Sequence, residues 1–205
     1  MKLSILLCDI DKSYNNINII DNNANIKILL DNNNHSYLQN KYIYIKPTYK
    51  KQCCLRKYMI HNGITVLYND IYSNIIYDIH FKTINKQYKL PIIYMFYNNH
   101  YIFITHFLKL KRINKSLQDI QIQLLCDTIE EKNIEFGKNI YICGYFGYNF
   151  SEHASEISSL CDKLSCNIPT IKTDQNTTLD KFIFVRKSAL VSRHIKCQNN
   201  LCYYN

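Results

Sequence analysis

The stretch between Tyr42 and Tyr58 mixes basic side chains with aromatic ones. Its cations are Lys46, Lys50, Lys51, Arg56 and Lys57, and its rings are Tyr42, Tyr44, Tyr49 and Tyr58. Cations bind phosphate groups and aromatic rings stack on bases, so the pattern is typical of a nucleic-acid contact. The alternative is a solvated loop, and the heavy use of Lys and Tyr throughout the chain favours that reading slightly.

The whole chain is basic, with 25 Lys and Arg against 16 Asp and Glu, a net charge of +9. That balance favours anionic partners, either nucleic acid or another phosphate-bearing ligand. A basic protein with no such partner remains the other interpretation.

Cysteine spacing raises the question of a metal centre. Cys161 and Cys166 stand five positions apart, as do Cys197 and Cys202, with His194 nearby. The compact two-residue spacing of most zinc sites is missing, so we expect ordinary buried thiols. The chain has nine cysteines, and neither a signal-peptide pattern nor an apolar run of membrane-spanning length is recognised. Free thiols in a reducing cytoplasm or nucleus, away from any membrane, are therefore the expectation.

Apolar periodicity predicts the elements that must position these residues. Runs rich in β-branched and aromatic residues predict strands at 2–8, 26–30, 64–68, 75–81, 90–97, 101–105, 140–143 and 182–185. Helical spacing predicts one helix beginning at Ser116, with Ser116 and Asp119 as a capping box, and a second over 151–164. The stretch 41–58 is expected to form a strand followed by a loop. No linker or repeat divides the chain, so residues 1–205 are expected to form a single domain.

Local matches in this order resemble the endonuclease/exonuclease/phosphatase family, which includes deoxyribonuclease-I-like enzymes. The residues ANIKILLD at 24–31 resemble the family's A-D-I-I-x-L-Q-E strand, and NGITVLY at 62–68 resembles its G-x-A-I-L strand. The residues YIFITHFL at 101–108 resemble the strand that ends in a His, and 118–129 match the following helix, which often carries R-x-x-Q. The residues IYICGYFGYN at 140–149 resemble I-I-x-G-D-F-N, and LDKFIFV at 179–185 resembles I-D-Y-I-F-V.

The resemblance implies a fold and a set of site residues. The fold is α/β, a four-layered sandwich of two β-sheets packed face to face with flanking helices, and its phosphodiester site lies at one end of the sheets. Asp9 and Asp31 match the family's metal-ligand positions, where carboxylate oxygens suit Mg²⁺ or Mn²⁺. His106 matches the phosphate-contacting His, Asp180 matches a late catalytic Asp, and His194 is a trace of the final S-D-H.

The resemblance also places a second basic cluster at the phosphate-binding end. This cluster follows His106 directly and consists of Lys109, Lys111, Arg112 and Lys115. It is the stronger candidate for phosphate or nucleic-acid binding.

Three positions depart from the family's catalytic motifs. Tyr145 stands where the family has its water-orienting Asp, and a phenol with an ordinary pKa of about 10 is neutral at pH 7. Gly147 stands where the family has Asn and offers no side-chain donor, although Asn149 could compensate if the loop were shifted. Arg193 replaces the Asp of S-D-H.

These departures favour a divergent protein of this fold that binds an anionic partner and whose catalysis is impaired or absent. The sequence leaves two alternatives open. One is an active Mg²⁺-dependent nuclease or phosphodiesterase with a rearranged site, and the other is a protein-interaction module that kept only the scaffold.

Overall fold

The fold is described from a computed structural model of the chain. It describes residues 3–9, 24–30, 42–45, 48–51, 57–61, 63–68, 75–84, 89–97, 99–107, 115–135, 138–148, 153–166, 170–173, 181–186, 194–198 and 201–204. For residues 6, 8 and 9 and for the strands at 42–61 and 170–204, the description covers the backbone alone.

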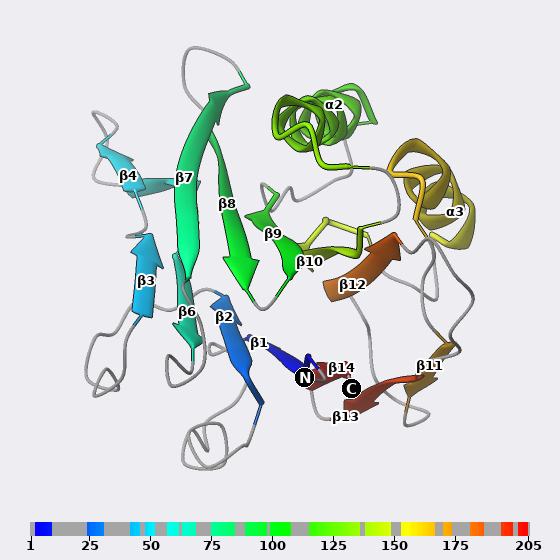
Figure 1. Cartoon of the computed structure of the whole chain (residues 1–205). Helices are drawn as coiled ribbons and strands as arrows, with labels where there is room; N and C mark the ends of the chain where they lie inside the picture. Colours follow the sequence, from blue (N-terminus) through cyan, green and yellow to red (C-terminus); the bar gives the residue numbers. More distant parts are fainter. Residues whose placement is uncertain are drawn as a thin grey trace.

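One sheet has seven strands and joins the two ends of the described chain (Figure 1). In spatial order its strands are β11 (Thr170–Thr173), β13 (His194–Gln198), β14 (Leu201–Tyr204), β1 (Ile5–Asp9), β2 (Ile26–Leu30), β6 (Ile64–Tyr68) and β3 (Tyr42–Ile45). β1 pairs in parallel with β2 and antiparallel with β14. Because β14 holds β13 on its other side, it connects the early and late parts of the sheet.

The second sheet has five strands in a nearly sequential order. They are β12 (Lys181–Arg186), β10 (Ile140–Tyr145), β9 (His100–His106), β8 (Lys89–Tyr97) and β7 (Ile76–Thr83). β7, β8 and β9 form an antiparallel meander, whereas β10 runs parallel to β9. Parallel neighbours need a crossover, and the helix α2 (Lys115–Glu131) supplies it.

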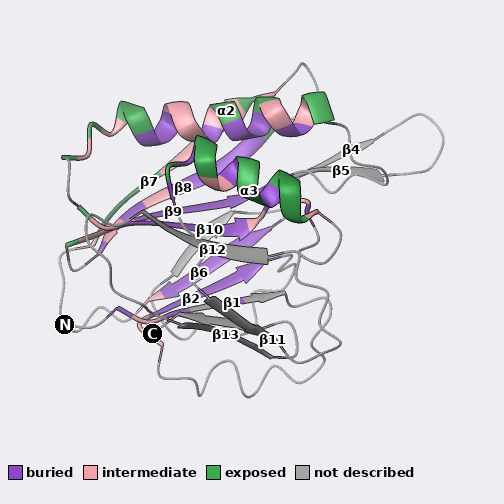
Figure 2. Ribbon diagram, turned by 90° about the vertical axis from the view of Figure 1, so that its right-hand side faces the viewer, coloured by how far each residue is buried: buried purple, intermediate pink, exposed green. Residues whose placement is uncertain are grey.

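The two sheets pack face to face, and α2 and α3 (Ala154–Lys163) lie across the outer face of the five-stranded sheet (Figure 2). Within the described residues no helix covers the outer face of the seven-stranded sheet. The predicted α/β sandwich of two sheets with flanking helices is confirmed.

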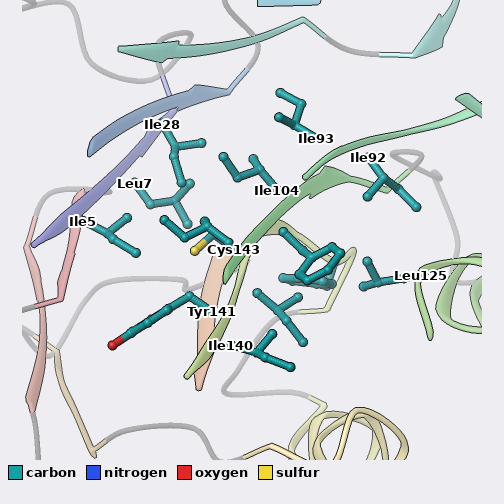
Figure 3. Packing of buried hydrophobic residues seen from close by; sticks show 14 of the residues in the cluster. Ile5, Leu7, Ile28, Ile92, Ile93, Ile104, Leu125, Ile140, Tyr141 and Cys143 are labelled. Carbon is teal, nitrogen blue, oxygen red and sulfur yellow. The ribbon is translucent and has the colours of Figure 1, made fainter. Parts of the chain in front are cut away.

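Alternating residues of the five-stranded sheet build two apolar layers (Figure 3). Ile93, Ile104 and Cys143 face Ile5, Leu7 and Ile28 of the other sheet, whereas Ile92 and Ile140 lie on the side of Leu125 of α2. Each of these side chains is buried, and full burial of such a side chain contributes about 1.5–3 kcal/mol. Burial on both faces explains why these strands are continuous apolar runs in the sequence.

Several sequence predictions need correction. The capping box is wrong, because α2 begins at Lys115, so Ser116 is already helical, and the Asp119 carboxylate accepts a hydrogen bond from Lys163 Nζ at 2.8 Å. The stretch after β3 is not only a loop, because β4 (Thr48–Lys51) and β5 (Lys57–His61) form a two-stranded ribbon. The strands β11, β13 and β14 were not predicted.

Candidate functional site

Strand register brings several predicted positions to one edge of the sandwich, which we call the site edge. In the seven-stranded sheet Asp9, the last residue of β1, is level with Leu30, the last residue of β2. In the five-stranded sheet His106, the last residue of β9, is level with Tyr145, the last residue of β10. Figure 2 shows β1 and β10 running in the same direction, so both sheets contribute carboxyl ends to this edge.

His106 and Tyr145 form a packed pair at the site edge. Their ring centroids lie 5.0 Å apart with the planes tilted by 36°, and His106 is only 2% exposed. His106 Nδ1 lies 2.9 Å from the carbonyl oxygen of Phe107. A carbonyl oxygen only accepts, so this contact requires a proton on Nδ1. The imidazole packs against a phenol at the position that the sequence resemblance matches to the family's carboxylate.

The turn after Tyr145 is fixed by close backbone packing. Gly144 has φ +147°, and a Cβ atom there would lie 1.9 Å from the Thr105 carbonyl oxygen. The Phe107 N–H donates to the Tyr145 carbonyl oxygen at 2.9 Å, which joins the ends of β9 and β10. Farther along the turn, burial raises the pKa of Tyr148, and the carboxylates of Asp119 and Glu156 raise it further, so this phenol stays neutral.

Gln118 has a place in this site that sequence analysis missed. Gly147 has φ +77°, and a Cβ atom there would lie 2.3 Å from Gln118 Nε2. The Gln118 amide therefore occupies the space beside Gly147, the position that the sequence resemblance matches to the family's Asn. Gln118 is buried, and its Oε1 accepts a hydrogen bond from Gln121 Nε2 at 3.0 Å. The signal was present in the sequence, since Lys115 and Gln118 have the spacing of the family's R-x-x-Q.

Strand register does not bring His194 to the site edge. His194 is the first residue of β13. The next residue, Ile195, is level with Tyr204 of β14, and Tyr204 is level with Ile5 at the start of β1. The backbone of His194 therefore lies toward the opposite edge from Asp9. The late residue level with Cys8 is Leu201, the first residue of β14, which follows Asn199 and Asn200 in the sequence.

The ribbon of β4 and β5 is inserted at the site edge. β3 ends at Ile45, which is level with Ile64 at the beginning of β6, and Ile64 is level with Leu30. The ribbon is the chain between those two ends, and it pairs Lys51 with Lys57 and Lys50 with Tyr58. The basic and aromatic stretch noticed in the sequence thus emerges from the edge that carries the candidate site.

The structure describes only some of the other predicted site residues. Lys115 is exposed at the start of α2, and Lys181, level with Tyr145, directly follows Asp180 in the sequence. Outside the described residues lie Asp31, Lys109, Lys111, Arg112, Asn149, Asp180 and Arg193. The candidate phosphate site is therefore described at His106, Tyr145, Gly147, Gln118 and Lys115, and at the backbone of Asp9.

No metal-binding group stands out in the described part of the chain. No cluster of three or more His, Cys, Asp or Glu side chains there could hold a metal ion. Cys126, Cys143, Cys161 and Cys166 form no disulfide, and of these Cys143 and Cys166 are buried. None of the described helices has the length and apolar character to cross a membrane.

Comparison with known proteins shows similarity at the level of the fold. No family model and no curated protein matches the sequence. A beta toxin variant from Staphylococcus aureus, solved with bound magnesium ions, superposes with a TM-score of 0.63 at 12% identity over 97% of this chain and 89% of the toxin. An endonuclease/exonuclease/phosphatase family protein from Leptotrichia buccalis gives 0.59 at 10% identity over 100% and 99%. Truncated TDP2 from Caenorhabditis elegans gives 0.56 at 13% identity over 98% and 96%.

The chain therefore has the endonuclease/exonuclease/phosphatase fold, the deoxyribonuclease-I-like α/β sandwich.

Proposed function

We propose that this chain binds nucleic acid through its phosphates at the site edge and that its hydrolytic activity is impaired or absent. The observation that carries the proposal is the packed pair of His106 and Tyr145. Hydrolysis of a phosphodiester needs a group that orients or deprotonates water and groups that neutralise developing charge. A neutral phenol supplies neither function at the position of the family's carboxylate, and removing one preorganised group typically costs about a hundredfold in rate.

Positive charge near the site edge supports phosphate binding. α2 begins with the exposed Lys115, and the positive end of a helix dipole favours an anion there. Lys109, Lys111 and Arg112 precede it in the sequence, and the ribbon with Lys50, Lys51 and Lys57 emerges from the same edge. Tyr49 and Tyr58 of the ribbon add aromatic rings of the kind on which unpaired bases stack.

An active Mg²⁺-dependent enzyme is the second candidate, and Asp9 favours it. Asp9 is two residues beyond Leu7, which faces the other sheet, and it ends β1 at the site edge. With Asp31 it would offer carboxylate oxygens, the ligands that Mg²⁺ prefers. His106 Nε2 would then contact the phosphate, and Gln118 would hold the turn at Gly147. A magnesium ion there would neutralise charge on the phosphate.

The test is an assay of labelled single-stranded, duplex and abasic DNA and of RNA with Mg²⁺ or Mn²⁺. The parent is compared with Tyr145→Asp, which supplies the missing carboxylate, and with Tyr145→Phe, which keeps the ring on His106 and removes the hydroxyl. Gly147→Asn is left out of the first set, because a Cβ atom at Gly147 collides with Gln118. Binding is followed by fluorescence anisotropy in the same samples.

The proposal predicts binding without cleavage by the parent and by Tyr145→Phe, and a gain of metal-dependent cleavage in Tyr145→Asp. Cleavage by the parent that is abolished in Asp9→Asn would establish the active enzyme instead. Absence of both binding and cleavage would contradict both candidates and leave a scaffold used for protein contacts.

A further inference from the structure

β7 is an edge strand with an unusually apolar exposed surface. It pairs with β8 along eight residues, and within the described chain no strand pairs with its other side. Ile76, Tyr77 and Phe81 are 59%, 48% and 44% exposed. Figure 1 shows β7 at the outer side of the five-stranded sheet. A long edge strand with exposed apolar side chains is a template for pairing with another strand.

The sequence of β7 is self-complementary about His80. In an antiparallel pair of two copies centred on His80, Asp78 of each copy stands opposite Lys82 of the other. In the same register Ile79 stands opposite Phe81, and Ile76 opposite Ile84. Directly opposite residues of antiparallel strands interact, and pairs of opposite charge or of two apolar side chains are favourable.

Asp78 and Lys82 are already held on the surface by the end of α2. Lys132 Nζ lies 3.1 Å from Asp78 Oδ2, and Lys82 Nζ lies 2.7 Å from Glu131 Oε1. The Asp78 side chain remains 52% exposed, and Glu131 is exposed as well. Pairing of two copies would join these ion pairs into a continuous row, Lys132–Asp78–Lys82–Glu131, on each side of the axis.

The charges select one register. Opposite side chains of an antiparallel pair share a face of the sheet, so the two-fold axis can move only by a whole residue. An axis at Ile79 would place Asp78 opposite His80 and Lys82 opposite Ile76, and an axis at Phe81 would also leave Asp78 and Lys82 without each other. Only the register centred on His80 matches Asp78 with Lys82 twice.

We propose that β7 is the interface of a two-fold symmetric homodimer, in which two copies pair antiparallel about His80 and their five-stranded sheets become one continuous sheet. An interface of this kind is isologous, since the same residues are used by both copies. It lies along the side of the sheet, whereas the candidate phosphate site lies at the strand ends. The antiparallel arrangement turns the two site edges in opposite directions. The interface at β7 uses none of the candidate site residues, so dimerisation does not depend on the proposed function.

The experiment begins with sedimentation velocity of the full chain between about 1 and 200 µM, a range that brackets small, transient interfaces. We expect a concentration-dependent monomer–dimer equilibrium. Asp78→Lys and Lys82→Glu each place like charges opposite one another at two symmetric positions, so each should weaken the dimer about tenfold or more. Lys138→Glu, which makes the same change in net charge as Lys82→Glu on an exposed lysine away from β7, should leave the equilibrium unchanged.

Mixing the two single variants separates pairing from local destabilisation. In a mixed dimer the new lysine at position 78 faces the new glutamate at position 82, and the native Lys82 faces the native Asp78. Native mass spectrometry of the mixture should therefore show the mixed dimer in excess over both homodimers. A change that only disturbed Lys132 or Glu131 within one copy could not produce this preference.

A parent that stays monomeric at every concentration would overturn the proposal. A dimer that both variants leave unchanged would overturn it too, because the interface would then lie elsewhere. A mixture without preference for the mixed dimer would rule out the register centred on His80.

Discussion

Gly144 and Gly147 lie on either side of Tyr145 in the sequence and differ in the atoms that pack against them. Gly144 lies against the backbone of Thr105, where a Cβ atom would meet the carbonyl oxygen at 1.9 Å. Gly147 lies against the end of the Gln118 side chain, which can rotate away at some cost in its hydrogen bond to Gln121. Both have a positive φ that L-residues rarely adopt.

We predict that Gly144→Ala destabilises the chain by about 3 kcal/mol or more, because the Thr105 carbonyl oxygen belongs to a buried sheet and cannot move aside. Gly147→Ala should cost about 1–2 kcal/mol, mostly from its left-handed backbone. Unfolding of both variants in guanidinium chloride measures the difference. Equal losses for the two variants would contradict the close approach at Thr105.

A second residue-scale prediction concerns Thr105, whose buried hydroxyl donates to the Pro91 carbonyl oxygen at 2.8 Å. Thr105→Val keeps the shape of the side chain and removes the donor, so the Pro91 carbonyl loses this partner. We expect a loss of about 1–3 kcal/mol in the free energy of unfolding. Thr105→Ser, which keeps the hydroxyl, is the control and should recover part of that loss. A Thr105→Val protein as stable as the parent would show that the bond contributes nothing.

Individual site residues were predictable where a local motif carries them. The strand ending in His106 and the G-Y-F-G turn are each contiguous in sequence, and the register of β9 and β10 places His106 and Tyr145 side by side. The register of His194 was not predictable, because a three-residue trace says nothing about the strand that follows it. Gln118 was overlooked because its contact with Gly147 depends on how a helix packs on a turn 29 positions later in the chain.

At the scale of elements, the end of α2 is tied to β7 and β8 by charges. Lys132 Nζ lies 3.1 Å from Asp78 Oδ2 and 4.6 Å from the centroid of the Tyr94 ring. The hydrogen bond from Lys132 is the main cause that lowers the pKa of Asp78 below its ordinary value, and the neighbouring His80 lowers it further. Burial raises the pKa of Tyr94.

We predict that Lys132→Gln raises the pKa of Asp78 toward its ordinary value. Since the folded-state pKa is lowered, the ion pair stabilises the fold above the unfolded-state pKa of about 4 and is lost as the pH falls through the folded-state pKa. The variant should therefore be less stable than the parent by about 0.5–1 kcal/mol at pH 7, and well below pH 4 the difference should shrink to the part that comes from the Tyr94 contact. NMR titration of the Asp78 carboxyl carbon checks the shift. Lys82→Gln, which leaves Lys132 in place, should leave most of it unchanged.

Elements with strong periodicity were predicted and weaker ones were not. β8, β9 and β10 are buried on both faces, so their apolar runs are long and unbroken. β13 and β14 are short and contain Lys, Gln, Cys and Tyr, with an Asn pair between them. β14 pairs with β1 from the opposite end of the chain and β13 pairs with β14, and no local pattern reports such long-range pairing.

At the scale of the molecule, the net charge of +9 should be visible in the salt dependence of binding. If Lys109, Lys111, Arg112 and Lys115 each neutralise one phosphate, the plot of log affinity against log salt should have a slope of about −3.6 for duplex DNA. Replacing all four with Gln should reduce that slope to near zero. Fluorescence anisotropy at several salt concentrations measures it.

Lys138→Gln is the control for this prediction, because Lys138 follows the far end of α2 and pairs with Glu135. An unchanged slope in the fourfold variant would move the phosphate contacts to the ribbon of β4 and β5. The same measurement on Lys50→Gln and Lys57→Gln would then locate them.

The position of β14 has a consequence for how the chain matures during synthesis. The five-stranded sheet needs nothing beyond Arg186, so it can form while the ribosome is still at work. The seven-stranded sheet cannot form that early, because one of the two neighbours of β1 is β14, which consists of residues 201–204. Until then the nascent chain presents the open edge of β1, an apolar strand, to its surroundings. Chaperone binding in this interval should concentrate on residues 5–9, although they are translated long before residues 201–204.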